Sequence, residues 1–209
     1  MNEIISYILC AVLAYLLGSL SFGVIISKLR YRDDIRRHGS GNAGATNALR
    51  TYGKLSAVLV LLGDFLKGTL AVLIGQQMGA DVALGGMIAG LFAVLGHLFP
   101  VYFRFKGGKG VATAAGTILM LNPLVLVALV IPFVLIIALS RYVSLGSVSV
   151  AVLYPVFTLV AGLLQKNPNT ILATVFAAVV GGLVAWMHRS NIKRLIAGTE
   201  SKLGGKKKE

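Results

Sequence analysis

Residues 110–140 read GVATAAGTILMLNPLVLVALVIPFVLIIALS, an apolar run that is too long for one membrane-spanning helix. A helix needs about 20 residues to cross the hydrocarbon core of a bilayer. Proline lacks a backbone donor and disfavours helix at the residue before it, so Asn122-Pro123 predicts a break. We therefore expect two segments, 110–121 and 123–140. The first is only about 18 Å long at 1.5 Å per residue, so we expect it to be short or re-entrant and buried among its neighbours.

Five further apolar runs flank this one, and they occupy 4–27, 55–79, 82–103, 142–164 and 169–187. None of them shows the polar face that a soluble core helix repeats every 3.6 residues. The composition agrees, because only 13% of the residues are charged whereas soluble domains have about 25%. The sequence therefore predicts an all-α integral membrane protein in which residues 1–209 form a single polytopic domain.

The positions of the basic residues predict seven transmembrane segments, one of them short or broken near Asn122-Pro123. With the N-terminus outside, every lysine and arginine except Lys67 and Lys166 then falls on the cytoplasmic side, as the positive-inside rule requires. Six segments would leave the basic C-terminal stretch outside. Glu3 precedes the first run and the basic residues follow it, which is opposite to a cleaved signal peptide. We expect a cytoplasmic C-terminus that ends in a basic, flexible tail at 202–209.

The net charge of +13 does not indicate a nucleic-acid partner. The positive charge gathers in short loops beside apolar runs, and aromatic residues do not alternate with it to make a base-stacking platform. Membrane lipids are the expected partner. The single cysteine, Cys10, lies inside the first run, so no intrachain disulfide is possible.

The first polar segment, residues 39–50, reads GSGNAGATNALR. Its small residues allow sharp turns, and successive backbone N–H groups in such turns bind anions. Its side-chain donors are Ser40, Asn42, Thr46 and Asn47. A helix that starts near Thr46 or Asn47 would also direct its N-terminal dipole at a phosphate. An ordinary turn explains the glycines, but it does not explain so many donors flanked by Arg36, Arg37 and Arg50.

The second polar segment, residues 106–113, reads KGGKGVAT. It lacks the spacing of a Walker A loop, yet it places a lysine between glycines just before a short helix. Positive-inside anchoring is the alternative explanation for Lys106 and Lys109.

The third polar segment, residues 188–200, reads HRSNIKRLIAGTE. In a continuing helix, His188 and Asn191 share one face, and Lys193 and Arg194 lie elsewhere, where they suit phosphate groups. A solvated basic tail is the alternative, and it is our interpretation of Lys206, Lys207 and Lys208.

Three more ionisable residues lie within apolar runs. Asp64 and Lys67 are three residues apart, and ionisable groups inside a span usually face a site or each other. We favour a structural pair near the site over a catalytic role. His97 either orients a substrate or bonds to the backbone.

Together, residues 40–47, 96–113 and 188–200 resemble, in order and spacing, the bacterial acyl-phosphate:glycerol-3-phosphate acyltransferase family, PlsY. The resemblance covers about residues 4 to 201. It implies transfer of a fatty acyl group from acyl phosphate to the 1-hydroxyl of sn-glycerol 3-phosphate, which gives lysophosphatidate and inorganic phosphate in the first step of phospholipid synthesis. The enzyme would be a monomer in the cytoplasmic (inner) membrane of a bacterium, with its active site facing the cytoplasm. It would need no metal and no cofactor.

The resemblance also assigns candidate site residues. The catalytic candidates are Ser40, Lys109, His188 and Asn191. The substrate-binding candidates are Gly41, Asn42, Gly44, Ala45, Thr46, Asn47, Arg50, His97, Lys106, Gly107, Gly108, Gly110, Thr113, Lys193 and Arg194. The H-x-x-x-x-D motif of soluble and peripheral glycerophosphate acyltransferases is missing, because Ala43, Tyr102 and Lys193 stand five residues after the three histidines.

The general base stays open between His188 and the departing phosphate of the donor. We favour the phosphate, because the sequence shows no carboxylate that would orient His188. Ser40 is expected to donate hydrogen bonds rather than to accept the acyl group, since no base is predicted beside it.

Two other functions fit the sequence less well. A transporter of phosphorylated metabolites would suit a broken helix, but its site belongs near the membrane midplane, whereas these motifs all lie at one face. A lipid headgroup phosphotransferase needs clustered aspartates for metal, and the aspartates here are scattered apart from Asp33-Asp34.

Overall fold

A computed structural model describes residues 2–204 of the chain. Within them the chain forms α-helices and two short 3-10 helices and no strand, so the all-α prediction is confirmed. The part of the predicted flexible tail that follows Gly204, including Lys206 to Lys208, lies outside the described residues. The chain divides into two compact units, Met1–Pro123 and Leu124–Glu209, and each is described by itself.

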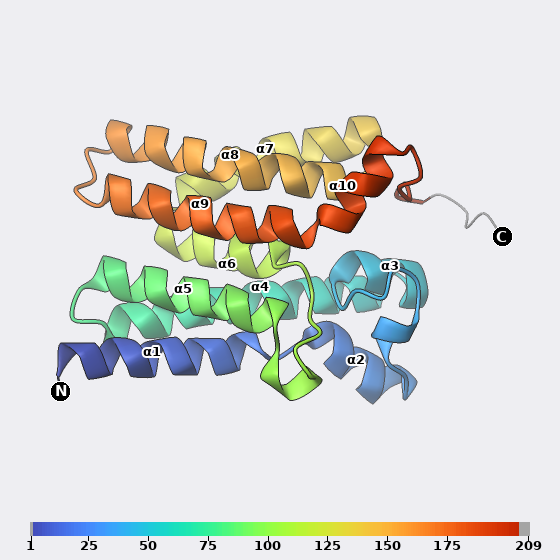
Figure 1. The fold of residues 1–209 in the computed structure, drawn as a ribbon, viewed down its shortest axis with the longest axis horizontal. Helices are drawn as coiled ribbons and strands as arrows, with labels where there is room; N and C mark the ends of the chain where they lie inside the picture. Colours follow the sequence, from blue (N-terminus) through green and yellow to red (C-terminus); the bar gives the residue numbers. More distant parts are fainter. Residues whose placement is uncertain (1, 205–209) are drawn as a thin grey trace. The chain divides into compact units, whose positions relative to one another are not determined.

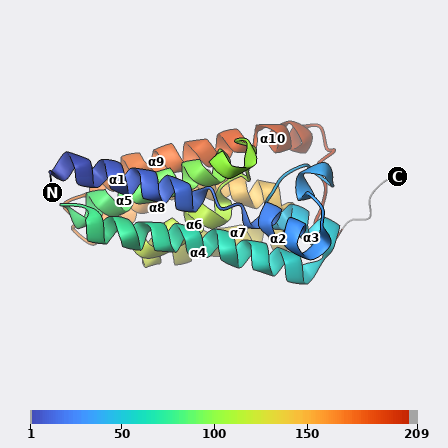
Figure 2. The ribbon, with the colours of Figure 1, turned by 90° about the horizontal axis from the view of Figure 1, so that it is seen from below.

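The first unit contains six α-helices (Figure 1). They are α1 (Glu3–Gly18), α2 (Phe22–Tyr31), α3 (Ala45–Tyr52), α4 (Lys54–Met78), α5 (Val82–Leu98) and α6 (Val111–Leu121). Two 3-10 helices, η1 (Ile35–Arg37) and η2 (Val101–Phe103), lie in the connections. The long helices α1, α4 and α5 run side by side, as Figures 1 and 2 both show, and α6 packs on α4.

Helices α4 and α6 approach each other closely because their contact is made of small residues. A Cβ atom on Gly68 would collide with the carbonyl oxygen of Thr113, and one on Gly116 would collide with that of Phe65. Such contacts are typical of membrane helices, which associate by close packing rather than by the hydrophobic effect. Thr113 is fully buried at this interface.

The first apolar run is interrupted, which the sequence did not predict. It forms α1 and α2, separated by Ser19, Leu20 and Ser21. A break frees backbone groups that have no water to bind in a bilayer, so protein must satisfy them. Nζ of Lys67 on α4 donates to the carbonyl oxygen of Leu20 at 2.7 Å. Counted by length and hydropathy, residues 3–31 still make one candidate span.

The predicted break at Asn122-Pro123 is confirmed. Helix α6 ends at Leu121, Asn122 is extended, and α7 begins at Pro123. Six helical segments of the described chain are long and apolar enough to cross a membrane, and α6 is a shorter apolar helix of 11 residues. The structure therefore has six candidate spans, and the short predicted segment corresponds to α6.

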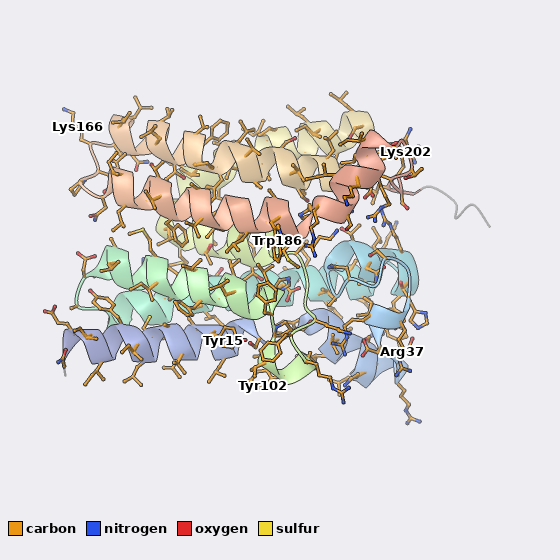
Figure 3. The ribbon with its side chains drawn as sticks, viewed as in Figure 1. Tyr15, Arg37, Tyr102, Lys166, Trp186 and Lys202 are labelled. Atoms are coloured by element: carbon orange, nitrogen blue, oxygen red, sulfur yellow. The ribbon has the colours of Figure 1, made fainter. Side chains whose placement is uncertain are left out.

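The second unit consists of α7 (Pro123–Ser140), α8 (Val143–Leu164), α9 (Thr170–Met187) and α10 (Arg189–Ile196). Helix α8 packs along α9, and side chains of Phe133 and Ile137 on α7 face Gly146 on α8. Figure 3 shows Lys166 and Lys202 at opposite ends of this unit. The N–H of Leu203 donates to the carbonyl of Arg141 at 2.7 Å, so the C-terminal segment reaches the α7–α8 turn.

Candidate active site

We call residues 38–47 loop 1 and residues 104–110 loop 2. Asn47 holds loop 1 in shape from the first turn of α3. Its side-chain oxygen accepts from the backbone N–H of Ser40 at 2.9 Å, and its side-chain nitrogen donates to the carbonyls of Ile35, His38 and Asn42 at 2.9 to 3.2 Å. Asn47 is 2% exposed. In this structure its amide therefore orders the loop, whereas the sequence suggested a donor to substrate.

The rest of loop 1 turns sharply, and the residues at its middle are exposed to solvent. Gly39 and Gly41 have φ of 56° and 72°, a left-handed backbone that favours glycine. The side-chain oxygen of Asn42 accepts from the N–H of Gly44 at 2.9 Å, just before α3 begins. Ser40 and Gly41 are exposed, while Thr46 is half-buried. The exposed serine and the first N–H groups of α3, which have no partner inside the helix, suit an anion.

Arg36 lies in η1, two residues before loop 1, and connects that segment to loop 2. One guanidinium nitrogen donates to the carbonyls of Phe103 at 2.8 Å and Lys106 at 3.3 Å, and the other nitrogens bind Asp34. The hydrogen bond from Arg36 is the main reason why the pKa of Asp34 falls to about 2. The sequence suggested that Arg36 flanks a phosphate, but the structure uses it to bring the two glycine-rich loops together.

Loop 2 lies against the end of α5. The N–H of Gly108 donates to the carbonyl of His97 at 3.1 Å, and a Cβ atom on Gly107 would collide with that same carbonyl. Gly110 precedes α6 with φ of 87°. The loop-2 glycines thus permit a close backbone approach and a left-handed turn. Lys106 is exposed and Lys109 is half-buried.

A polar cluster beside loop 1 was missed by the sequence analysis. Nε2 of His38 lies 2.6 Å from Oδ2 of Asp33, and the hydroxyl of Tyr52 donates to the same oxygen at 2.9 Å. The ring of Tyr52 stacks on Tyr31 with centroids 4.1 Å apart. Burial first, and then Asp33, raises the pKa of Tyr52 to about 12. The cluster fixes the chain between α2 and loop 1, and residue spacing alone carries no signal for it.

In the second unit, His188 and Asn191 lie at the junction of α9 and α10 and are 3% and 5% exposed. Nδ1 of His188 is 2.8 Å from the carbonyl oxygen of Val184. Because a carbonyl only accepts, Nδ1 carries the proton in this arrangement and Nε2 is left as the acceptor. Such a histidine is able to accept a proton or a hydrogen bond at Nε2.

Glu200 orders the third polar segment. Its Oε1 accepts from the side chains of Asn191 at 2.7 Å and Ser144 at 2.8 Å, and its Oε2 accepts from Nε of Arg194 at 2.7 Å. Burial alone would raise the pKa of Glu200, but these hydrogen bonds lower it below its ordinary value. The sequence motif contained Glu200 without giving it a role, and Ser144 was not identified at all.

The predicted site residues thus fall into two groups. The first unit brings together loop 1, loop 2 and His97. The second unit brings together His188, Asn191 and Arg194. Arg50 lies exposed on α3, Lys193 lies exposed on α10, and Thr113 is buried between α4 and α6.

Known proteins resemble the chain over nearly its whole length. A family model described as glycerol-3-phosphate acyltransferase matches residues 8–198. A glycerol-3-phosphate acyltransferase of Clostridioides difficile (strain 630) is 44% identical, over 98% of this chain and 99% of the relative. One from Syntrophomonas wolfei subsp. wolfei is 46% identical, over 93% of this chain and 96% of the relative.

Two solved structures are also similar. Both are crystal structures of PlsY (YgiH), an integral membrane glycerol 3-phosphate acyltransferase. The glycerol 3-phosphate form has a TM-score of 0.84 and 40% identity, over 95% of this chain and 96% of that chain. The lysophosphatidic acid form has a TM-score of 0.82 and 40% identity, over 94% and 95%. Since sequence and structure both match along almost the entire length, the chain belongs to the glycerol-3-phosphate acyltransferase family of integral membrane enzymes.

Proposed function

We propose that this enzyme transfers a fatty acyl group from acyl phosphate to the 1-hydroxyl of sn-glycerol 3-phosphate and releases lysophosphatidate and inorganic phosphate. The observation that supports it best is the pair of glycine-rich loops joined by Arg36. Both substrates carry phosphate, and this end of the first unit offers backbone N–H groups next to lysine and arginine side chains. The PlsY structures were solved in glycerol 3-phosphate and lysophosphatidic acid forms, which fits this substrate and this product.

In this proposal different segments of the chain bind different parts of the substrates. Ser40 and the backbone of loop 1 bind phosphate together with Lys106 and Lys109. Arg50, Lys109, His188 and Asn191 contact glycerol 3-phosphate. The acyl chain lies among the apolar helices, where each buried methylene contributes about 0.8 kcal/mol.

The chemistry needs positioning more than activation. The hydroxyl oxygen attacks the acyl carbonyl carbon, and the bond from that carbon to the phosphate oxygen breaks. The phosphate leaves with the bonding electron pair, and the hydroxyl proton moves to that phosphate or to Nε2 of His188. Acyl phosphate is already a reactive mixed anhydride, so the site works mainly by alignment and charge stabilisation.

The proposed topology places both loops and the C-terminus in the cytoplasm, with α6 counted as a short seventh segment. Support comes from the charge pattern, because Lys166 and Lys202 lie at opposite ends of the second unit and basic residues gather beside Lys202. A cysteine scan tests it, since Cys10 is the sole cysteine and is fully buried. In a Cys10→Ser background, Lys166→Cys should react with an impermeant maleimide on intact cells, and Lys202→Cys only after permeabilisation.

The decisive assay compares palmitoyl phosphate with palmitoyl-CoA as donors to glycerol 3-phosphate. Release of phosphate and lysophosphatidate in equal amounts, from palmitoyl phosphate alone, is the expected result. Lys109→Met should lower this activity, whereas Lys166→Met, at the far end of the second unit, should retain it. Product from palmitoyl-CoA alone would contradict the proposal that acyl phosphate is the donor. If folded protein gives no product with either donor, a transporter becomes the better interpretation.

A further inference from the structure

Asp64, Lys67 and His97 form a buried ionisable cluster within the membrane-spanning helices of the first unit. Their exposed fractions are 2%, 2% and 3%. Nζ of Lys67 is 2.8 Å from Oδ1 of Asp64, and Nδ1 of His97 is 3.4 Å from the same oxygen. Ionisable groups inside a span are costly, so a cluster of three calls for an explanation in terms of function.

Lys67 connects the cluster to loop 1. Its Nζ also donates to the carbonyl of Leu20, the backbone group that the break between α1 and α2 sets free. Helix α2 begins two residues later and packs directly on loop 1, since a Cβ atom on Gly23 would collide with the carbonyl oxygen of Ala43. The position of Lys67 therefore sets where α2, and with it the buried side of loop 1, is held.

His97 connects the cluster to loop 2. Its carbonyl accepts from the N–H of Gly108, and a Cβ atom on Gly108 would collide with Nε2 of the same histidine. The ring of His97 is thus enclosed between Asp64 on one side and the backbone of loop 2 on the other. Asp64 thus lies directly against the ring that loop 2 contacts on its other side.

Stability alone does not account for this arrangement. Replacing a buried ion pair with apolar side chains of similar volume is often neutral or stabilising, because the charges no longer have to be desolvated. Moreover, the partly exposed Arg36 already connects the segment before loop 1 to loop 2 through hydrogen bonds. The cluster adds a second connection, which fixes the distance between loop 1 and loop 2 on their buried side.

We propose that Asp64, Lys67 and His97 are positioning residues that hold the two glycine-rich loops at the spacing required to bind the phosphate of glycerol 3-phosphate. None of the three touches substrate, so this assigns His97 a different role from the substrate contact that the sequence suggested. The inference rests on the proposed phosphate-binding role of the loops. It is tested by binding of glycerol 3-phosphate alone, which does not depend on the identity of the acyl donor.

The main test is the double variant Asp64→Leu/Lys67→Met, which removes both charges together and leaves neither one buried without its partner. We expect the variant to fold with a Tm somewhat below that of the parent, because the carbonyl of Leu20 loses its donor. The Kd for glycerol 3-phosphate, measured by calorimetry, should rise by about 10-fold or more, as displaced binding groups would cause. The single variant Lys67→Arg, in which Asp64 is intact, keeps the buried cation. It should retain much of the parent's affinity for glycerol 3-phosphate. An unchanged Kd in the folded double variant would overturn the proposal.

Gly108→Ala tests the same contact from the loop and does not alter the buried charges. We expect it to weaken binding in the parent but to add little in the double variant, because both changes act through the placement of loop 2.

Asp81→Ala is the matched control. Asp81 caps the other end of α5 by accepting from the N–H of Leu84 at 2.7 Å, so its loss should lower the Tm and leave the Kd unchanged. If the double variant does not fold, an unchanged Kd for Gly108→Ala overturns the proposal. If the variants behave as expected while palmitoyl phosphate gives no product, only the acyl donor is wrong.

Discussion

The side-chain nitrogen of Asn191 donates to Oε1 of Glu200 at 2.7 Å. This bond fixes the orientation of the Asn191 amide, which is only 5% exposed. Glu200 also binds Ser144 on α8 and Arg194 on α10, so it joins the C-terminal segment to two helices of the second unit. Hydrogen bonds that a buried carboxylate accepts from several donors are among the stronger ones in proteins.

Glu200→Gln should therefore reduce activity without any contact between Glu200 and substrate. Glutamine keeps the shape but removes the charge that three donors share, so the Asn191 amide loses its orientation. We expect kcat/KM for glycerol 3-phosphate to fall by about 10-fold or more, as the loss of one to two kcal/mol implies. Steady-state kinetics measures this, with Thr199→Ala at the exposed neighbour as control. Equal kinetics for Glu200→Gln and the parent would show that Asn191 needs no such support.

A matched pair of asparagines tests the order of loop 1. Asn47→Asp removes the donors to three carbonyls and places a carboxylate against them, whereas Asn42→Asp keeps the acceptor that Gly44 uses. We expect Asn47→Asp to lose about 2 kcal/mol or more of stability, and Asn42→Asp to lose less than about 1 kcal/mol. Thermal unfolding in detergent gives both values. A similar Tm for the two variants would refute the role of Asn47.

The sequence predicted the membrane class, the break at Asn122-Pro123 and the polar segments, because each has a local cause. Proline breaks a helix by its own chemistry, and apolar runs of membrane length need no partner to be recognised. The start of α3 at Ala45 was also close to the expected Thr46 or Asn47. Features that depend only on residues close in sequence could thus be predicted.

Features that depend on a distant partner were not predicted. The break at 19–21 contains no proline and is completed by Lys67, which lies 47 residues from Leu20 in the sequence. Arg36 and Asn47 looked like ligands for phosphate, yet their donors bind carbonyls of the protein. A donor-rich loop has the same composition whether its donors face a substrate or its own backbone, so only the fold distinguishes these cases.

The ion pair of Asp34 with Arg36 predicts how stability depends on pH. The pKa of Asp34 is lowered from 3.8 to about 2, so its contribution is fully present above about pH 4 and is lost as the pH falls toward 2. The pair is partly exposed, so we expect this contribution to be at most about 1 kcal/mol. The Tm difference between the parent and Asp34→Asn should be constant from pH 8 to 5 and shrink below pH 4. A difference that vanishes already near pH 6 would contradict this.

Gly110 provides a test of backbone strain at the start of α6. Its φ of 87° is unfavourable for residues with a Cβ atom, so Gly110→Ala should cost about 1–2 kcal/mol. Gly182 lies in the middle of α9 with open space around its Cβ position, so Gly182→Ala should be neutral or slightly stabilising. Thermal unfolding of both variants measures the difference. Equal effects would show that the left-handed turn before α6 is not required.

His188 decides between the two candidate bases. Its Nδ1 bonds to the carbonyl of Val184, so Nε2 is the ring nitrogen that would accept a proton. Glutamine places a polar group near the Nε2 position but does not titrate near neutral pH, so His188→Gln retains a hydrogen bond and loses the base. If the departing phosphate takes the proton, kcat at saturating glycerol 3-phosphate should stay within about 10-fold of the parent while KM rises. Loss of general-base catalysis costs about 100-fold or more, so a fall in kcat of that size, with Tm and helical content unchanged, would assign the proton to His188.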